Sequence, residues 1–204
     1  MTGITVHTLG QAVKTANARM ATLEGELNAA DSLLGDGDTG VMLARVLGKF
    51  AETGIEAGAD LGAAFQSLAR AAAAATGSSL GTLFATALLA VGKRTKDVEE
   101  VAWAQLSPLL QAALEAMIQR GGASLGDKTV LDAVDAVVRA TAGLDDADEI
   151  SIAACEAANR TLASFRDKPC RIGRARMFAE KSIGMDDPGM LGFARLVEAL
   201  AAKA

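Results

Sequence analysis

Apolar residues recur at intervals of three and four along most of this chain, the spacing that gives an α-helix one buried face. In the first such stretch the apolar positions are Val13, Ala16, Met20, Leu23 and Leu27. The pattern resumes after each polar or glycine-containing connection and predicts eight helices. Their expected ranges are 8–30, 40–53, 60–75, 83–91, 97–119, 128–141, 149–165 and 188–202.

Local residues refine two of these helices. Pro108 lies inside the fifth and is expected to kink it or to split it, because proline favours an early helical position. Asp127 is a candidate N-cap for the sixth, because its carboxylate can accept a bond from a free N–H of the first turn. A long irregular stretch, 166–187, is expected to cross to the last helix.

The composition favours an all-α fold. Half of the 204 residues are hydrophobic, only 3% are aromatic, and tyrosine is absent. Alanine and leucine are strong helix formers, whereas β-branched and aromatic residues are enriched in strands. No repeat or change in composition divides the chain. We therefore expect residues 1–204 to form one domain of antiparallel helices joined mostly by short connections.

Charge, hydropathy and reactive residues exclude several classes of function. The net charge is −5 and no basic stripe is present, so nucleic acid is not the expected partner. The apolar runs are too short to span a membrane, and no signal peptide is recognised. Cys155 and Cys170 lack metal or redox spacing, so we expect them reduced and the protein cytoplasmic. With His7 as the sole histidine, a Ser-His-Asp or Cys-His hydrolase is excluded.

The glycine-rich connections alternate along the chain. They precede the second, fourth, sixth and eighth helices, and in an up-and-down bundle these helices all begin at the same end. Helix N-termini present free N–H groups and a partial positive charge, which suit phosphate. One end of the bundle is therefore predicted to bind a polyphosphate. The alternative is that these glycines only make turns, which would not explain the alternation.

Three carboxylates lie close together in the first of these connections. Asp31, Asp36 and Asp38 are interleaved with Gly35 and Gly37. Like charges this close repel one another unless a cation lies between them. Mg²⁺ takes one or two protein carboxylates and completes its shell with water and phosphate oxygens. We therefore predict a Mg²⁺–nucleotide site here, the alternative being a solvated acidic turn.

The later connections offer further candidate contacts. Thr39 and Gly40 would supply donors at the start of the second helix, and Ser78 and Ser79 at the start of the fourth. A Walker A pattern is absent. Gly122 suits a flat contact beneath a base or ribose.

Three polar residues close the set of candidates. Thr129 could add a hydroxyl, Arg174 could clamp a phosphate, and Asp187 could contact the ribose or base. Each of the three could equally be an ordinary helix or surface residue.

Together these motifs resemble the L subunit of dihydroxyacetone kinase (DhaL). The likeness covers nearly the whole chain, with the motifs in the same order. It rests on Asp31-x4-Gly35-Asp36-Gly37-Asp38-Thr39-Gly40, Gly77-Ser78-Ser79, Gly121-Gly122-Ala123-x-x-Gly126-Asp127-Lys128-Thr129, Gly173-Arg174-Ala175, Ser182-Ile183-Gly184 and Asp187-Pro188-Gly189.

The resemblance implies a closed barrel of eight antiparallel helices, with ADP or ATP at one end and two Mg²⁺ held by the three aspartates. It also implies a partner, a K subunit that holds the keto-sugar covalently through a histidine of its own. In some systems a phosphotransferase-system protein rephosphorylates bound ADP, and in others ATP exchanges directly. The nucleotide contacts implied by the match are Thr39, Gly40, Val41, Met42, Ser78, Ser79, Gly122, Arg174, Asp187, Pro188 and Gly189.

Several positions depart from the family pattern. Thr39 stands where many L subunits have His, Leu80 where a Gly usually follows the serines, and Met185 where His is usual. These departures leave open a K subunit for another keto-sugar such as erythrulose. Two other classes of function also remain open. One is a non-enzymatic sensor whose nucleotide state controls binding to a regulator, and the other is a plain helical interaction bundle.

Overall fold

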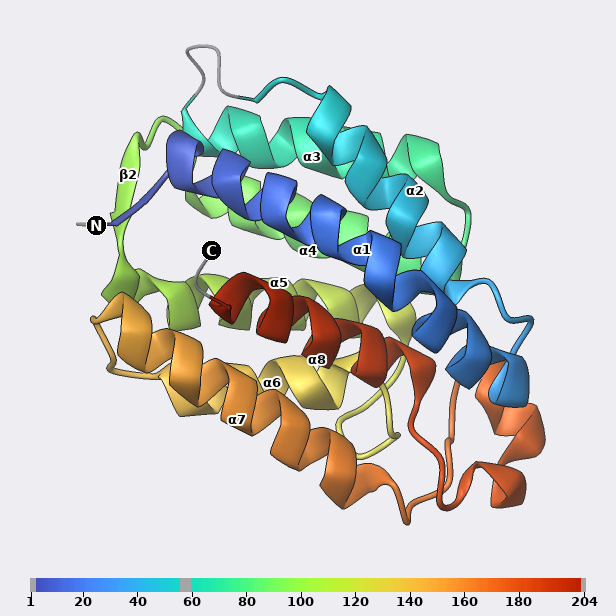
Figure 1. Ribbon diagram of the computed structural model, residues 1–204. Coiled ribbons are helices and arrows are strands. Elements are labelled where there is room, and N and C mark those ends of the chain that lie inside the picture. The colour runs from blue at the N-terminus through green and yellow to red at the C-terminus, as the bar shows by residue number, and fades with distance from the viewer. Residues whose placement is uncertain (1–2, 56–59, 203–204) are drawn as a thin grey trace.

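The computed structural model describes residues 3–55 and 60–202, with the side chain of Arg174 outside that description. In this part of the chain, helices run back and forth along one axis (Figure 1). The α-helices are α1 Val6–Leu34, α2 Thr39–Glu52, α3 Leu61–Ala75, α4 Ser79–Arg94, α5 Leu106–Gly121, α6 Val130–Thr141, α7 Ala147–Phe165 and α8 Pro188–Ala201. The shorter elements are β1 Gly3–Thr5, β2 Glu100–Ala102 and the 3₁₀ turns η1 Trp103–Gln105, η2 Arg174–Phe178 and η3 Glu180–Ser182.

Successive helices pack side by side, and α8 returns to pack against α1, so the ring of helices closes. The prediction of an all-α bundle of eight antiparallel helices is confirmed. The connections before α2, α4, α6 and α8 lie at one end, on the right in Figure 1, and the intervening connections lie at the other. We call the first of these ends, which contains residues 35–38, 76–78, 122–129 and 166–187, the site end.

The core fills the space between the helices. Leu27, Val46 and Ala158 are fully buried in one large apolar cluster to which α1, α2 and α7 all contribute. Phe50 and Phe84 meet edge to face in it, with ring centroids 5.6 Å apart. Burying a leucine side chain stabilises a fold by about 1.5–3 kcal/mol, so such a core can fix the helix ends that build a site.

One predicted helix is wrong over its first part. The sequence suggested a helix over 97–119, but β2 pairs antiparallel with β1, placing Ile4 opposite Val101, and η1 follows. The α-helix starts only at α5. Pro108 is its third residue, in the first turn, where a missing N–H removes no intrahelical bond. The expected split at Pro108 is therefore also wrong, because α5 runs through this residue unbroken and the chain before it forms β2 and η1.

The predicted N-cap of α6 is also wrong. Thr129 caps this helix, accepting a bond from Leu131 N, and Asp132 accepts one from Thr129 N to complete a capping box. The Asp127 side chain instead accepts a bond from Ser124 N within the connection.

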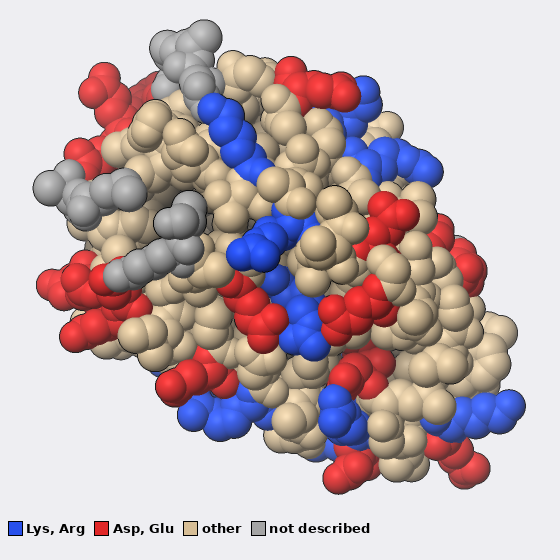
Figure 2. Space-filling model, in the orientation of Figure 1, with Lys and Arg blue, Asp and Glu red and all other residues tan. Residues whose placement is uncertain are grey.

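The described helices include none that is both long enough and apolar enough to cross a membrane. Figure 2 shows Lys and Arg mixed with Asp and Glu on the face it displays. The absence of a nucleic-acid partner stays a prediction.

Candidate functional site

The three predicted metal ligands come together at the site end. One carboxylate oxygen from each of Asp31, Asp36 and Asp38 lies within 4.8 Å of the others. Asp31 is 7% exposed, whereas the other two side chains face solvent. Oxygens bound to one Mg²⁺ at about 2.0–2.1 Å are separated by roughly 3–4 Å, so a small contraction would bring these three onto one ion. Carboxylates are the hard oxygen donors that Mg²⁺ requires, and the cluster therefore fits the ion.

The fold holds the cluster together through Asp31. This residue lies in the last turn of α1, which extends beyond the predicted end at residue 30. Its Oδ2 accepts hydrogen bonds from Asp38 N at 2.9 Å and Thr39 N at 3.2 Å. Gly37 turns the chain between the two helices with φ +77°, a conformation that side chains rarely adopt. A short loop thus brings a buried and two exposed carboxylates to one point.

Sequence reasoning missed Asn28. Its Oδ1 accepts hydrogen bonds from Gly40 N at 2.8 Å and Val41 N at 3.1 Å, so it occupies amides in the first turn of α2. The predicted donation from Gly40 N to a phosphate would require this side chain to move. Asn28 stands one helical turn before Asp31, a spacing that could have revealed it once α1 was predicted to reach residue 31.

The other helix starts at this end are close to one another. A Cβ placed on Gly189 would lie 3.6 Å from Leu80 Cδ1 and 3.6 Å from Val130 Cβ, so α8 begins between the starts of α4 and α6. Each of these three helices has a polar N-cap side chain. Ser78 accepts a bond from Gly81 N at 3.0 Å, Thr129 caps α6, and Asp187 accepts one from Met190 N at 2.8 Å.

The remaining predicted nucleotide contacts lie in varied surroundings. Val41, Ser79 and Gly122 are exposed at the site end, and Gly122 ends α5 with φ +67°. Thr39, Gly40 and Pro188 are buried there. The Met42 side chain packs in the core, so its role as a contact still rests on the resemblance alone. Arg174 begins η2 in the segment before α8, and its predicted clamp concerns a side chain outside the described part of the structure.

Burial raises the pKa of Asp187 to about 6, although Met190 N–H and the charge of Lys128 oppose the shift. The folded protein therefore holds this proton more tightly than the unfolded chain, whose carboxyl titrates near 3.8. Asp187 makes the stability of the nucleotide-free protein fall as pH rises from about 4 to about 6, and its contribution is constant above that range.

A carboxyl titration with a midpoint near pH 6 is the expected result for Asp187 in the nucleotide-free protein. The measurement is a ¹³C NMR titration of the side-chain carboxyl signals. In Asp187→Asn this transition should disappear while the fold remains, because asparagine caps helices as well as aspartate does. A midpoint near 4 in the wild-type protein would contradict the assignment.

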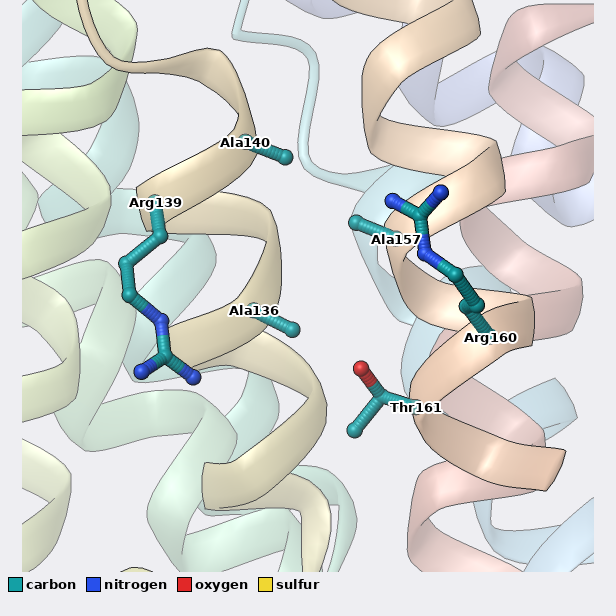
Figure 3. Close-up of a pocket in the computed structure, with 6 residues that line it drawn as sticks. All are labelled: Ala136, Arg139, Ala140, Ala157, Arg160 and Thr161. Carbon is teal, nitrogen blue, oxygen red and sulfur yellow. The ribbon is translucent and has the colours of Figure 1, made fainter. Parts of the chain in front are cut away.

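A separate groove of about 300 Å³ lies on the flank of the bundle between α6 and α7 (Figure 3). Ala136 and Ala140 of α6 face Ala157 of α7 across it, and an arginine stands on each side. These arginines already pair with acids, Arg139 with Asp135 at 2.5 Å and Arg160 with a glutamate at 3.9 Å. The groove contains none of the predicted site residues.

Comparison with known families and proteins finds similarity to kinases and kinase subunits. The family model described as the DAK2 domain matches residues 33–202. The L-erythrulose 1-kinase of Mycolicibacterium smegmatis is 33% identical over 184 residues, which cover 87% of this chain and 32% of that protein. The ADP-binding subunit DhaL of the PEP-dependent dihydroxyacetone kinase 1 of Listeria innocua is 32% identical over 175 residues, 85% of this chain and 84% of that subunit.

A solved structure shares the fold. The dihydroxyacetone kinase of C. freundii, crystallised with AMP-PNP and Mg²⁺, superimposes with a TM-score of 0.74 at 23% identity, covering 98% of this chain and 34% of that one. The chain thus spans about a third of the erythrulose kinase and of this dihydroxyacetone kinase, but most of the DhaL subunit.

Proposed function

The chain belongs to the DAK2 domain family as a DhaL-type member, and from this premise we propose that it is the nucleotide-binding subunit of a dihydroxyacetone-type kinase. It would bind ADP or ATP with Mg²⁺ and pass a phosphoryl group to a keto-sugar held on a separate K subunit. The observation that carries the proposal is the cluster of Asp31, Asp36 and Asp38 beside the first turn of α2. Two Mg²⁺ at this cluster would give the stoichiometry that the family likeness implies.

The chain's own residues would bind and orient the nucleotide. Asp31, Asp36 and Asp38 would hold Mg²⁺, which when bound neutralises charge on the phosphates during transfer. The starts of α4, α6 and α8 would direct N–H groups toward the phosphates and sugar. Asp187, Pro188 and Gly189 would form the wall between the starts of α4 and α6. No side chain is assigned a covalent role, because the proposed work of the subunit is positioning.

Exposed apolar side chains at the site end support docking of a partner there. A K subunit must approach this end, because phosphoryl transfer needs the sugar next to the nucleotide. Contiguous exposed apolar patches mark interaction sites on protein surfaces. The most exposed ones in the segments at this end are Leu33, Val41, Leu125, Met177 and Ile183.

Calorimetric titration of ADP and ATP, with Mg²⁺ and with EDTA, tests the nucleotide site. We expect binding that requires Mg²⁺. No binding in any condition, from folded protein that carries no nucleotide, would overturn the proposal and favour an interaction bundle. Retained ADP that resists exchange would favour a phosphotransferase-system donor, whereas ready exchange of ATP would favour its direct use.

Reconstitution with a K subunit tests the acceptor. Dihydroxyacetone is the proposed acceptor, and erythrulose is the second candidate because the relative at 33% identity is an L-erythrulose 1-kinase. Phosphorylated product should appear only when both chains are present. Nucleotide binding without transfer to either sugar would favour a nucleotide-state sensor.

A further inference from the structure

Lys128 is a buried lysine to which the proposed function gives no role. It lies between α5 and α6, 1% exposed, and is the largest side chain among those the structure shows fully buried. Its Nζ donates to three main-chain carbonyl oxygens, of Arg166 at 3.1 Å, Lys168 at 2.7 Å and Ser182 at 2.8 Å. An ammonium has three hydrogens, so these bonds use its full donor capacity.

This arrangement is costly. Burial lowers the pKa of Lys128, and the nearby carboxylates of Asp187 and Asp186 only partly oppose that effect. The backbone of Lys128 is left-handed, with φ +61°, a strained conformation for a residue other than glycine. An apolar side chain would avoid the desolvation but would leave three carbonyl oxygens without this donor. The three hydrogen bonds from Lys128 Nζ are therefore what the buried charge contributes to the structure, and the next question is what they hold together.

The three carbonyls belong to the two ends of one segment, 166–187, which connects α7 to α8. Arg166 and Lys168 begin it, and Ser182 ends η3. The same ends are joined by the Gly184 N to Arg166 O bond at 2.8 Å. Two bonds between the Arg166 guanidinium and the Asp186 carboxylate, at 2.9 and 2.6 Å, join them again. Lys128 therefore lies at the closure of a loop.

This loop links the start of α6 to the aspartate cluster. Lys128 directly precedes Thr129, the N-cap of α6, and the loop runs into Asp187, the N-cap of α8. From the loop, Cys170 and Ala175 pack on Leu34, the last residue of α1 and three residues beyond Asp31. A shift of the loop would thus move the Asp187 turn and η2 relative to the carboxylates.

We propose that Lys128 is a positioning residue whose ammonium fixes the 166–187 loop against the start of α6, and so sets the position of the Asp187–Gly189 turn relative to the aspartate cluster. The effect of this geometry on nucleotide affinity rests on the proposed function. The fixing of the loop does not, because every contact involved belongs to the nucleotide-free chain.

Hydrogen–deuterium exchange on nucleotide-free Lys128→Met tests the proposal. Methionine is of similar length and apolar but has no donors. We expect amides of 166–187, including Cys170 and Gly184, to exchange at least about tenfold faster, with α2 and α3 unchanged. Mg²⁺–ADP affinity should fall by about tenfold as well. The control is Ser107→Ala, which removes a buried 2.8 Å bond to Val138 O between α5 and α6, away from the loop.

Two outcomes would overturn the proposal. One is unchanged exchange across 166–187, and the other is an equal acceleration in all helices, as a general loss of stability would give. If Lys128→Met does not fold, Lys128→Gln is used instead, because it keeps a shorter donor. The same pattern of hydrogen–deuterium exchange is then expected for it. Absence of Mg²⁺–ADP binding in the wild-type protein would defeat the proposed function alone, because the exchange pattern is measured without nucleotide.

Discussion

Asp36→Asn is expected to weaken Mg²⁺–ADP binding on the order of 100-fold while the protein stays folded. Residues that only support metal ligands typically contribute about 10–100-fold to affinity, and a direct ligand should contribute at the upper end or more. The Asp36 side chain faces solvent, so the substitution leaves no cavity. Removing one of three clustered negative charges should also leave the metal-free melting temperature unchanged or slightly higher. Calorimetry gives the affinity, and thermal unfolding with and without Mg²⁺ gives the stability.

Asp145→Asn is the matched control for that experiment. It makes the same change of charge at an exposed residue in the connection between α6 and α7, at the opposite end of the bundle. We expect it to bind Mg²⁺–ADP like the wild-type protein. If Asp36→Asn also bound normally, or if both variants weakened binding equally through net charge, the aspartate cluster would not be the metal site.

The fold could be predicted to the extent that its information is local. The spacing of Val134, Val137, Val138 and Thr141 is enough to identify α6, and each is buried as that spacing requires. The pairing of Ile4 with Val101 could not be found in the same way, because a three-residue strand carries almost no periodic pattern and its partner is distant in sequence. The N-cap of α6 could have been identified from the sequence, because Thr129 and Asp132 have the spacing of a capping box.

The candidate site likewise has a part that local sequence determines and a part that depends on residues distant in sequence. Clustering of Asp31, Asp36 and Asp38 follows from their closeness in sequence and a glycine turn, so it could be predicted. The part played by Lys128 depends on carbonyl oxygens 38 to 54 residues away, and only the folded chain shows them together. Backbone oxygens also carry no residue signature. The contacts that place one loop against another were therefore outside the reach of the sequence.

Gly40→Ala is expected to lower the free energy of unfolding by about 3 kcal/mol. Overpacking costs roughly 1–3 kcal/mol, and the upper end applies here because the atoms in the way belong to the main chain, which cannot easily move aside. Gly40 is buried where α2 crosses α1, and a Cβ there would collide with the Glu24 carbonyl oxygen and lie 2.8 Å from Asn28 Oδ1. Urea denaturation gives the stability. Because the helices must separate, Mg²⁺–ADP affinity should fall too.

Gly25→Ala, in α1, is the matched control, since a Cβ at this exposed position would meet nothing within 4 Å. Replacing glycine by alanine inside a helix stabilises it by about 0.5–1 kcal/mol, so the same substitution should have the opposite sign here. Equal stabilisation in both variants would show that α1 and α2 do not need the close approach at Gly40. The placement of Asp38 and Thr39 beside Asp31 would then depend on the 35–38 loop and on the bonds from Gly40 N and Val41 N to Asn28.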